Sequence, residues 1–142
     1  MQKIFFCLLL LVLSIDNAMA KELNVIVNKS ASIDKLSAVD IRRIYLAKMS
    51  FFPNGDKIVA LDVSQDSNLY ANFYEAVVGK GIAQISSYWS RMLFTGKGRP
   101  LEQISDRSKL IKLVEGDKKY IGYVEGEVLS ENIKIVYSMT LP

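Results

Sequence analysis

The stretch that decides the fold is KIVALDVSQDSNLYANFYEAVV, residues 57–78. Its first seven residues, KIVALDV, are mostly apolar and predict a buried strand over residues 57–63. Residues 64–67 form a polar entry, and apolar residues at helical spacing then predict a helix over residues 68–78. A strand that leads through a short polar turn into a helix is the unit from which α/β sheets are built.

Strands and helices alternate through the rest of the chain. Short runs rich in β-branched residues predict three more strands, over residues 23–27, 120–124 and 133–137. Apolar residues at helical spacing predict three more helices, over residues 38–48, from Ile82 to the turn at 95–100, and after the capping pair Ser105 and Asp106. Because strand–helix–strand crossovers join parallel strands, we expect an α/β fold with a mostly parallel sheet of about four strands flanked by about four helices.

The N-terminus has the pattern of a secretory signal peptide. Lys3 precedes an apolar run over residues 4–13, and Ala18-Met19-Ala20 matches a signal-peptidase site. The apolar run is shorter than the roughly 20 residues that a membrane-spanning helix needs. We therefore expect a cleaved signal peptide at residues 1–20 and a single periplasmic domain at residues 21–142, with a retained signal anchor as the alternative.

The composition excludes several classes of function. The chain has no histidine, and its one cysteine, Cys7, lies within the predicted signal peptide. Residues 21–142 therefore lack the side chains for imidazole or thiolate metal sites and for Ser-His or Cys-His catalysis, so we expect no enzyme activity, no metal and no cofactor. The net charge of +3 is mild and the basic residues form no run, so we expect no nucleic-acid partner.

The polar entry at the start of the 68–78 helix allows two interpretations. The first turn of a helix has unpaired N–H groups and a partial positive charge. Ser64, Ser67 and Asn68 lie beside this turn and are therefore candidate ligands for a small oxyanion. Serine and aspartate are also the ordinary residues that cap a helix without any ligand. Asp66 would repel a dianion at this place, which favours the capping interpretation.

The turn Thr95-Gly96-Lys97-Gly98-Arg99 is a second candidate. Gly96 and Gly98 allow the backbone to approach a ligand closely, and Lys97 and Arg99 supply positive charge. The alternative is a helix C-cap, in which glycine ends the helix and cations favour its carbonyl end. The two candidates form one site only if the fold brings this turn close to the start of the 68–78 helix.

Four segments together resemble a known family. They are DIRRIYLAKMSFFPNGDKIVALD (residues 40–62), SQDSNLYANFY (64–74), YWSRMLFTGKGRP (88–100) and YIGYVEG (120–126). In this order they resemble the phosphate-binding periplasmic proteins of ABC transporters, above all the short single-domain proteins labelled substrate-binding-like. The similarity covers about residues 23–136.

The resemblance implies one lobe of a type II periplasmic binding-protein fold, in which two α/β lobes clamp an oxyanion. Ser67 falls on a phosphate-binding serine of the family, and Gly96-Lys97-Gly98 resembles its glycine-rich segment. Val63 and Leu69 stand where the family has an arginine and a threonine. A two-lobed clamp needs on the order of 250–300 residues, so the opposite wall would have to come from another protein or from a second copy of the chain.

Two functions are consistent with these features. The first is a periplasmic solute-binding-like protein that recognises phosphate or a related oxyanion and is linked to phosphate transport. The second is a non-catalytic interaction module that keeps the fold and docks on a membrane sensor or transport component. The valine at position 63 favours the second function, whereas Ser67 with Gly96-Lys97-Gly98 favours the first.

Overall fold

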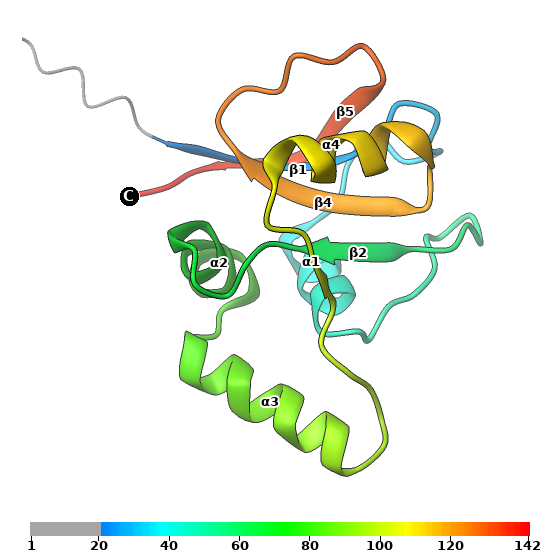
Figure 1. Ribbon diagram of the computed structural model, residues 1–142. Helices are drawn as coiled ribbons and strands as arrows, with labels where there is room; N and C mark the ends of the chain where they lie inside the picture. The colour runs from blue at the N-terminus through cyan, green and yellow to red at the C-terminus, as the bar shows by residue number, and fades with distance from the viewer. Residues whose placement is uncertain (1–20) are drawn as a thin grey trace, which may run out of the picture.

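The computed structural model describes residues 21–142, in which five strands and four α-helices are arranged around one sheet (Figure 1). The strands are β1 (Glu22–Asn28), β2 (Val59–Asp62), β3 (Glu102–Gln103), β4 (Tyr120–Glu125) and β5 (Ile133–Thr140). The helices are α1 (Ala38–Tyr45), α2 (Asn68–Phe73), α3 (Ile82–Phe94) and α4 (Arg107–Gly116), and a π-helical turn, η1 (Tyr74–Val78), extends α2. The signal peptide predicted at residues 1–20 lies outside the described residues. Within the described ones, no helix has both the length and the apolar character needed to cross a membrane.

Two helices begin at the capping residues that the sequence indicated. The Ser37 hydroxyl accepts a hydrogen bond from the Asp40 N–H (3.1 Å) at the start of α1. The Asp106 carboxylate accepts one from the Ser108 N–H (2.8 Å) at the start of α4. Each bond satisfies an N–H group that has no partner within the first helical turn.

The α/β class is confirmed, but the sheet has five strands and is mixed rather than mostly parallel. Its strand order is β3-β2-β4-β1-β5. β2 is parallel to β3 and β4, whereas β1 is antiparallel to β4 and β5. Crossovers through helices account for the parallel half. β1 inserts between two later strands, and the alternation of elements along the chain does not specify where a terminal strand inserts. β3 has two residues, which is too short for a recognisable strand pattern.

Both faces of the sheet are covered. Val25 and Val27 of β1 belong to a core shared with α1, η1 and α3, whereas Ile26 packs with Leu110 and Val114 of α4. This alternation follows from the two-residue period of a strand. The result is three layers, with α4 on one face of the sheet and the other helices on the opposite face (Figure 1).

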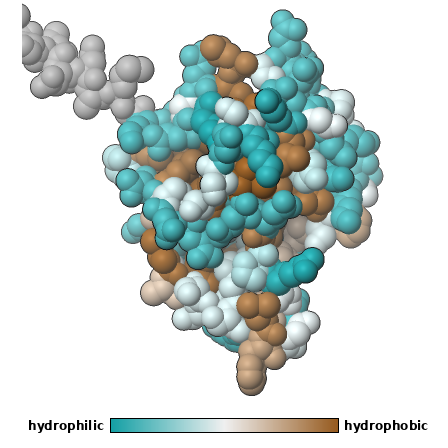
Figure 2. Space-filling view, in the orientation of Figure 1, coloured by the Kyte–Doolittle hydropathy of each residue, from teal (hydrophilic) through white to brown (hydrophobic). Residues whose placement is uncertain are grey.

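α3 extends away from the sheet (Figure 1). Ile85 and Trp89 are the buried residues of this helix, and they join the core on the side of α1. At its C-terminal end Leu93 is 56% exposed and Phe94 is 94% exposed, and Figure 2 shows an apolar tip there. The end of α3 therefore presents apolar surface to solvent.

One carboxylate is buried where β2 ends. Asp62 is 3% exposed, and its carboxylate accepts hydrogen bonds from the Tyr74 hydroxyl (2.6 Å), the Tyr123 hydroxyl (2.5 Å) and the Val63 N–H (2.9 Å). It forms no ion pair within residues 21–142. Burial raises the pKa of Asp62 from 3.8 to about 6, and the hydrogen bonds oppose part of this rise.

Replacing Asp62 with asparagine should reduce the pH dependence of stability. Because the pKa of Asp62 is higher in the folded chain than its ordinary value, the folded chain holds this proton more tightly than the unfolded chain, and stability is lost as the pH rises from about 4 to about 6. Urea titrations give the free energy of unfolding of the wild type and of Asp62→Asn at each pH. We expect the wild-type value minus the variant value to fall by about 2–3 kcal/mol from about pH 4 to about pH 7.

Glu131→Gln is the matched control for this experiment. Glu131 is exposed and lies in the loop before β5, outside the Asp62 network. We expect its substitution to change the pH dependence of stability far less. A difference between wild type and Asp62→Asn that stays constant over this pH range would contradict the raised pKa.

Candidate functional site

A cavity of about 160 Å³ opens where β2 and β4 end. Because β2, β3 and β4 are parallel, their carboxyl ends, and the helices that follow β2 and β3, meet at one edge of the sheet. This edge is where α/β sheets bind ligands. The polar residues that line the cavity are Ser64, Ser67, Ser105, Arg107 and Glu125. No group of acidic side chains in residues 21–142 has the arrangement of a metal site.

Ser67 acts as the N-cap of α2. Its hydroxyl accepts a hydrogen bond from the Tyr70 N–H (3.1 Å) and donates one to the Ser64 carbonyl oxygen (2.7 Å), so its proton is used within the loop. The Ser64 hydroxyl accepts a long bond from the Asp66 N–H (3.4 Å), and its own proton has no acceptor in the described part of the chain. Asn68 is exposed and does not line the cavity. Of Ser64 and Ser67, Ser64 is therefore the one whose hydroxyl can donate to a ligand.

Arg107 brings a cation to this cavity, and our sequence analysis did not identify it. It is the first residue of α4, and its Nη2 donates a hydrogen bond to the Glu127 carbonyl oxygen (2.7 Å). A guanidinium group has five N–H donors, so others remain for a ligand. The sequence signal was a capped helix start, Ser105-Asp106, followed by arginine. That this helix begins beside Ser64 was not visible without the fold.

Glu125 adds a negative charge to the same cavity. Its carboxylate lies 3.2 Å from Nζ of Lys21, and both side chains are partly exposed. The cavity therefore contains one arginine and one glutamate rather than a cluster of cations. Asp62 lies beneath it, because Val63 and Tyr123, which donate hydrogen bonds to the Asp62 carboxylate, are lining residues. Such a site suits an oxyanion that also carries a hydrogen-bond donor, because guanidinium groups donate and carboxylates accept.

The turn at residues 95–99 lies elsewhere. Gly96 has a φ of 66°, and the Lys97 N–H donates a hydrogen bond to the Met92 carbonyl oxygen (3.0 Å), which ends α3 as a C-cap does. Arg99 lines a different cavity, beside β2. Figure 1 shows this turn at the C-terminal end of α3, away from the start of α2. The structure therefore does not bring the two candidate segments together around one ligand.

No protein-family model matches the chain, and no curated protein sequence matches it. Several solved structures share its fold. An ABC-type phosphate transport receptor from Vibrio cholerae matches with a TM-score of 0.63 and 15% identity, over 82% of this chain and 46% of that one. A putative phosphate ABC transporter substrate-binding protein with bound phosphate, from Clostridium perfringens, matches with a TM-score of 0.62 and 24% identity, over 82% and 45%. A possible phosphate binding protein from Planctomyces limnophilus matches with a TM-score of 0.61 and 19% identity, over 82% and 41%.

The chain spans less than half the length of these proteins, since it covers 46%, 45% and 41% of them. It corresponds to one part of a larger fold in each comparison. The single-lobe architecture expected from the sequence is thereby confirmed, with the mixed sheet described above. Residues 21–142 have the fold of one lobe of a phosphate ABC transporter substrate-binding protein.

Proposed function

We propose that this chain is a periplasmic solute-binding-like protein, exported by its signal peptide, that recognises phosphate or a related oxyanion and is linked to phosphate transport. The observation that carries this proposal is the cavity where β2 and β4 end. There the Arg107 guanidinium at the start of α4 and the Ser64 hydroxyl in the loop before α2 offer hydrogen-bond donors. The fold supports the same class of ligand, because one structure that shares it is described with bound phosphate.

The charged groups of the cavity favour a protonated oxyanion. Arg107 donates hydrogen bonds and carries a positive charge, whereas the carboxylate of Glu125 only accepts. Hydrogen phosphate has a hydroxyl group that can donate to a carboxylate, and sulfate has none at neutral pH. We therefore expect this site to prefer phosphate to sulfate.

A single lobe covers only one side of the ligand. The cavity of about 160 Å³ is open to solvent, so a bound anion keeps part of its hydration and its electrostatic interactions stay screened by water. The chain alone should therefore bind weakly. A second wall, from another copy or from a component of a transporter, would exclude water and raise the affinity.

Calorimetric titration with phosphate tests the site. We expect weak binding by the wild type and at least about tenfold weaker binding by Arg107→Gln, because hydrogen bonds to charged groups contribute about 1.5–3 kcal/mol. Lys97→Gln is the control, since it removes one positive charge from an exposed position that does not line the cavity. Its affinity should stay within about twofold of the wild type, because a distant exposed charge is screened by salt.

Two results would contradict the proposal. Equal binding of phosphate by the wild type and Arg107→Gln would remove the site from this cavity. Absence of binding for both phosphate and sulfate would reject oxyanion recognition by the chain and would favour the second function.

That second function, a non-catalytic module that docks on an envelope sensor or transport component, is favoured by the end of α3. Leu93 and Phe94 are adjacent, exposed and apolar. Apolar side chains that are grouped on a projecting surface often mark a contact with another protein. Docking and ligand binding use different surfaces here, so one chain can do both.

Site-specific cross-linking in cells tests this docking surface. We expect a photo-reactive residue at position 94 to give one discrete adduct in the envelope, because Phe94 is 94% exposed at the tip of α3. The same residue at position 109, an exposed lysine on α4, should give none. Equal labelling from both positions, or no adduct from position 94, would reject docking through α3.

A further inference from the structure

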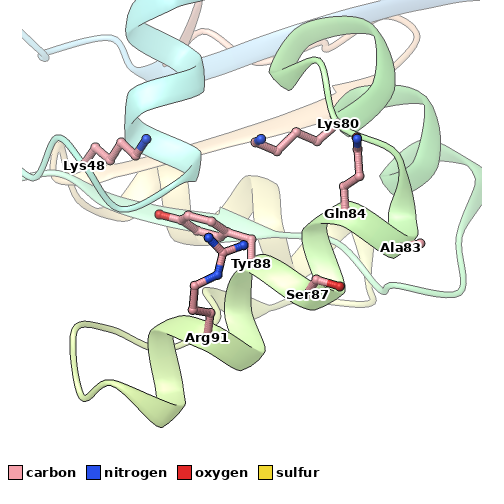
Figure 3. Close-up of a pocket in the computed structure, with 7 residues that line it drawn as sticks. All are labelled: Lys48, Lys80, Ala83, Gln84, Ser87, Tyr88 and Arg91. Atoms are coloured by element: carbon pink, nitrogen blue, oxygen red, sulfur yellow. The ribbon is translucent and has the colours of Figure 1, made fainter.

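A second and larger hollow lies between α3 and the segment that follows α1. Its volume is about 550 Å³, and its polar lining consists of Lys48, Lys80, Gln84, Ser87, Tyr88 and Arg91 (Figure 3). We call it the basic groove. Lys48 comes from the turn after α1, Lys80 from the turn after η1, and the other four from one face of α3. The volume falls within the range of small-molecule sites, about 300–1,000 Å³.

The three cations of the basic groove have no counter-charge. No carboxylate lines the groove, and Lys48, Lys80 and Arg91 form no ion pair within residues 21–142. Figure 3 shows the side chains of Lys48 and Lys80 extending toward one another from opposite sides. Like charges brought together repel, and a concave surface of one sign concentrates ions of the opposite sign. The groove therefore attracts anions.

Neutral polar side chains also line the basic groove, on its α3 side. Gln84 Oε1 accepts a hydrogen bond from the Gly81 N–H (3.1 Å), so its NH₂ group is directed away from that contact, and Figure 3 shows its nitrogen at the tip nearest Lys80. Ser87 lines the groove one helical turn further along α3, and Figure 3 shows its hydroxyl oxygen directed away from Arg91. Gln84 therefore adds N–H donors to the positive charges, as sites for phosphate oxygens do.

The two walls of the basic groove are joined by a hydrogen bond. The Tyr88 hydroxyl donates to the Leu46 carbonyl oxygen at 2.6 Å, which ties α3 to the end of α1. Leu46 is 2% exposed, so one side of this contact belongs to the core. Lys48 and Arg91 are therefore carried by segments of fixed relative position, which reduces the entropy lost when a ligand binds both.

We propose that the basic groove binds a small anion with several negative charges, of the condensed or organic phosphate class. A ligand of this kind can reach cations from all three segments, whereas a single tetrahedral anion fills only part of a 550 Å³ hollow. Arginine suits phosphate by paired hydrogen bonds and lysine by point charge. An acidic protein segment would also need apolar contacts, and the lining offers only Ala83 and the ring of Tyr88. This site is independent of the cavity at the sheet edge.

Calorimetric titration of the full chain with inorganic tripolyphosphate tests the proposal. We expect binding by the wild type that weakens as salt is added, and at least about tenfold weaker binding by the double variant Lys80→Gln/Arg91→Gln. Lys97→Gln/Arg99→Gln is the matched control, because it removes the same two charge types from exposed positions outside the groove. The affinity of this control for tripolyphosphate should stay within about threefold of the wild type. Unchanged circular dichroism shows that each variant is folded.

Other outcomes would overturn the proposal. Loss of tripolyphosphate binding in Arg107→Gln, with the groove variant unaffected, would place the anion at the sheet edge. Equal weakening in the groove variant and its matched control would mean general attraction by net charge. Tighter binding of a hexaglutamate peptide than of tripolyphosphate would assign the groove to an acidic protein segment. Absence of heat together with an unchanged thermal unfolding temperature at millimolar tripolyphosphate would exclude the site, whatever the result with phosphate at the sheet edge.

Discussion

The hydrogen bonds to the buried carboxylate of Asp62 hold together the edge of the sheet where the cavity opens. Tyr74 on η1 and Tyr123 on β4 donate to it, and the Val63 N–H donates where the chain leaves β2. A buried carboxylate without a cation is costly in free energy, and hydrogen bonds offset that cost only while all partners stay in place. The network therefore links the ends of β2 and β4 to η1, which follows α2.

The opposite wall of the cavity depends on a close approach of α4 to β4. A Cβ atom at Gly122 would lie 2.8 Å from Cδ2 of Leu110, which is closer than real contacts allow. The missing side chain lets α4 lie low on the sheet, and Arg107 at its first turn then borders the same cavity as Ser64. Two unrelated packing solutions, a tyrosine-bonded carboxylate and a glycine contact, thus place one hydroxyl and one guanidinium at a common site.

Sequence patterns predicted what depends on neighbours along the chain. The helix expected over residues 68–78 is α2 with η1, and its N-cap is Ser67, because spacing and capping are local properties. Contacts between distant segments were not predictable in this way. They include the insertion of β1 between β4 and β5, the bond from Tyr123 to Asp62 across 61 residues, and the arrival of Arg107 beside Ser64. The resemblance to binding proteins correctly predicted the fold of a single lobe. It also suggested that the turn at residues 95–99 and the start of α2 form one site, whereas the fold separates them.

The two sites that we propose for anions differ in the charged groups that line them. The cavity at the sheet edge contains one arginine and one glutamate, so its preference comes from the pattern of donors and acceptors rather than from net charge. The basic groove contains three cations and no carboxylate, and the net charge of the chain is also +3, so all other charged groups together sum to zero. α3 makes this difference possible: Ile85 and Trp89 anchor one of its faces in the core, which leaves Ser87 and Arg91 to face the groove. Because three cations share one concave surface that no carboxylate lines, we expect anion attraction at the groove, and we expect discrimination among anions at the sheet edge.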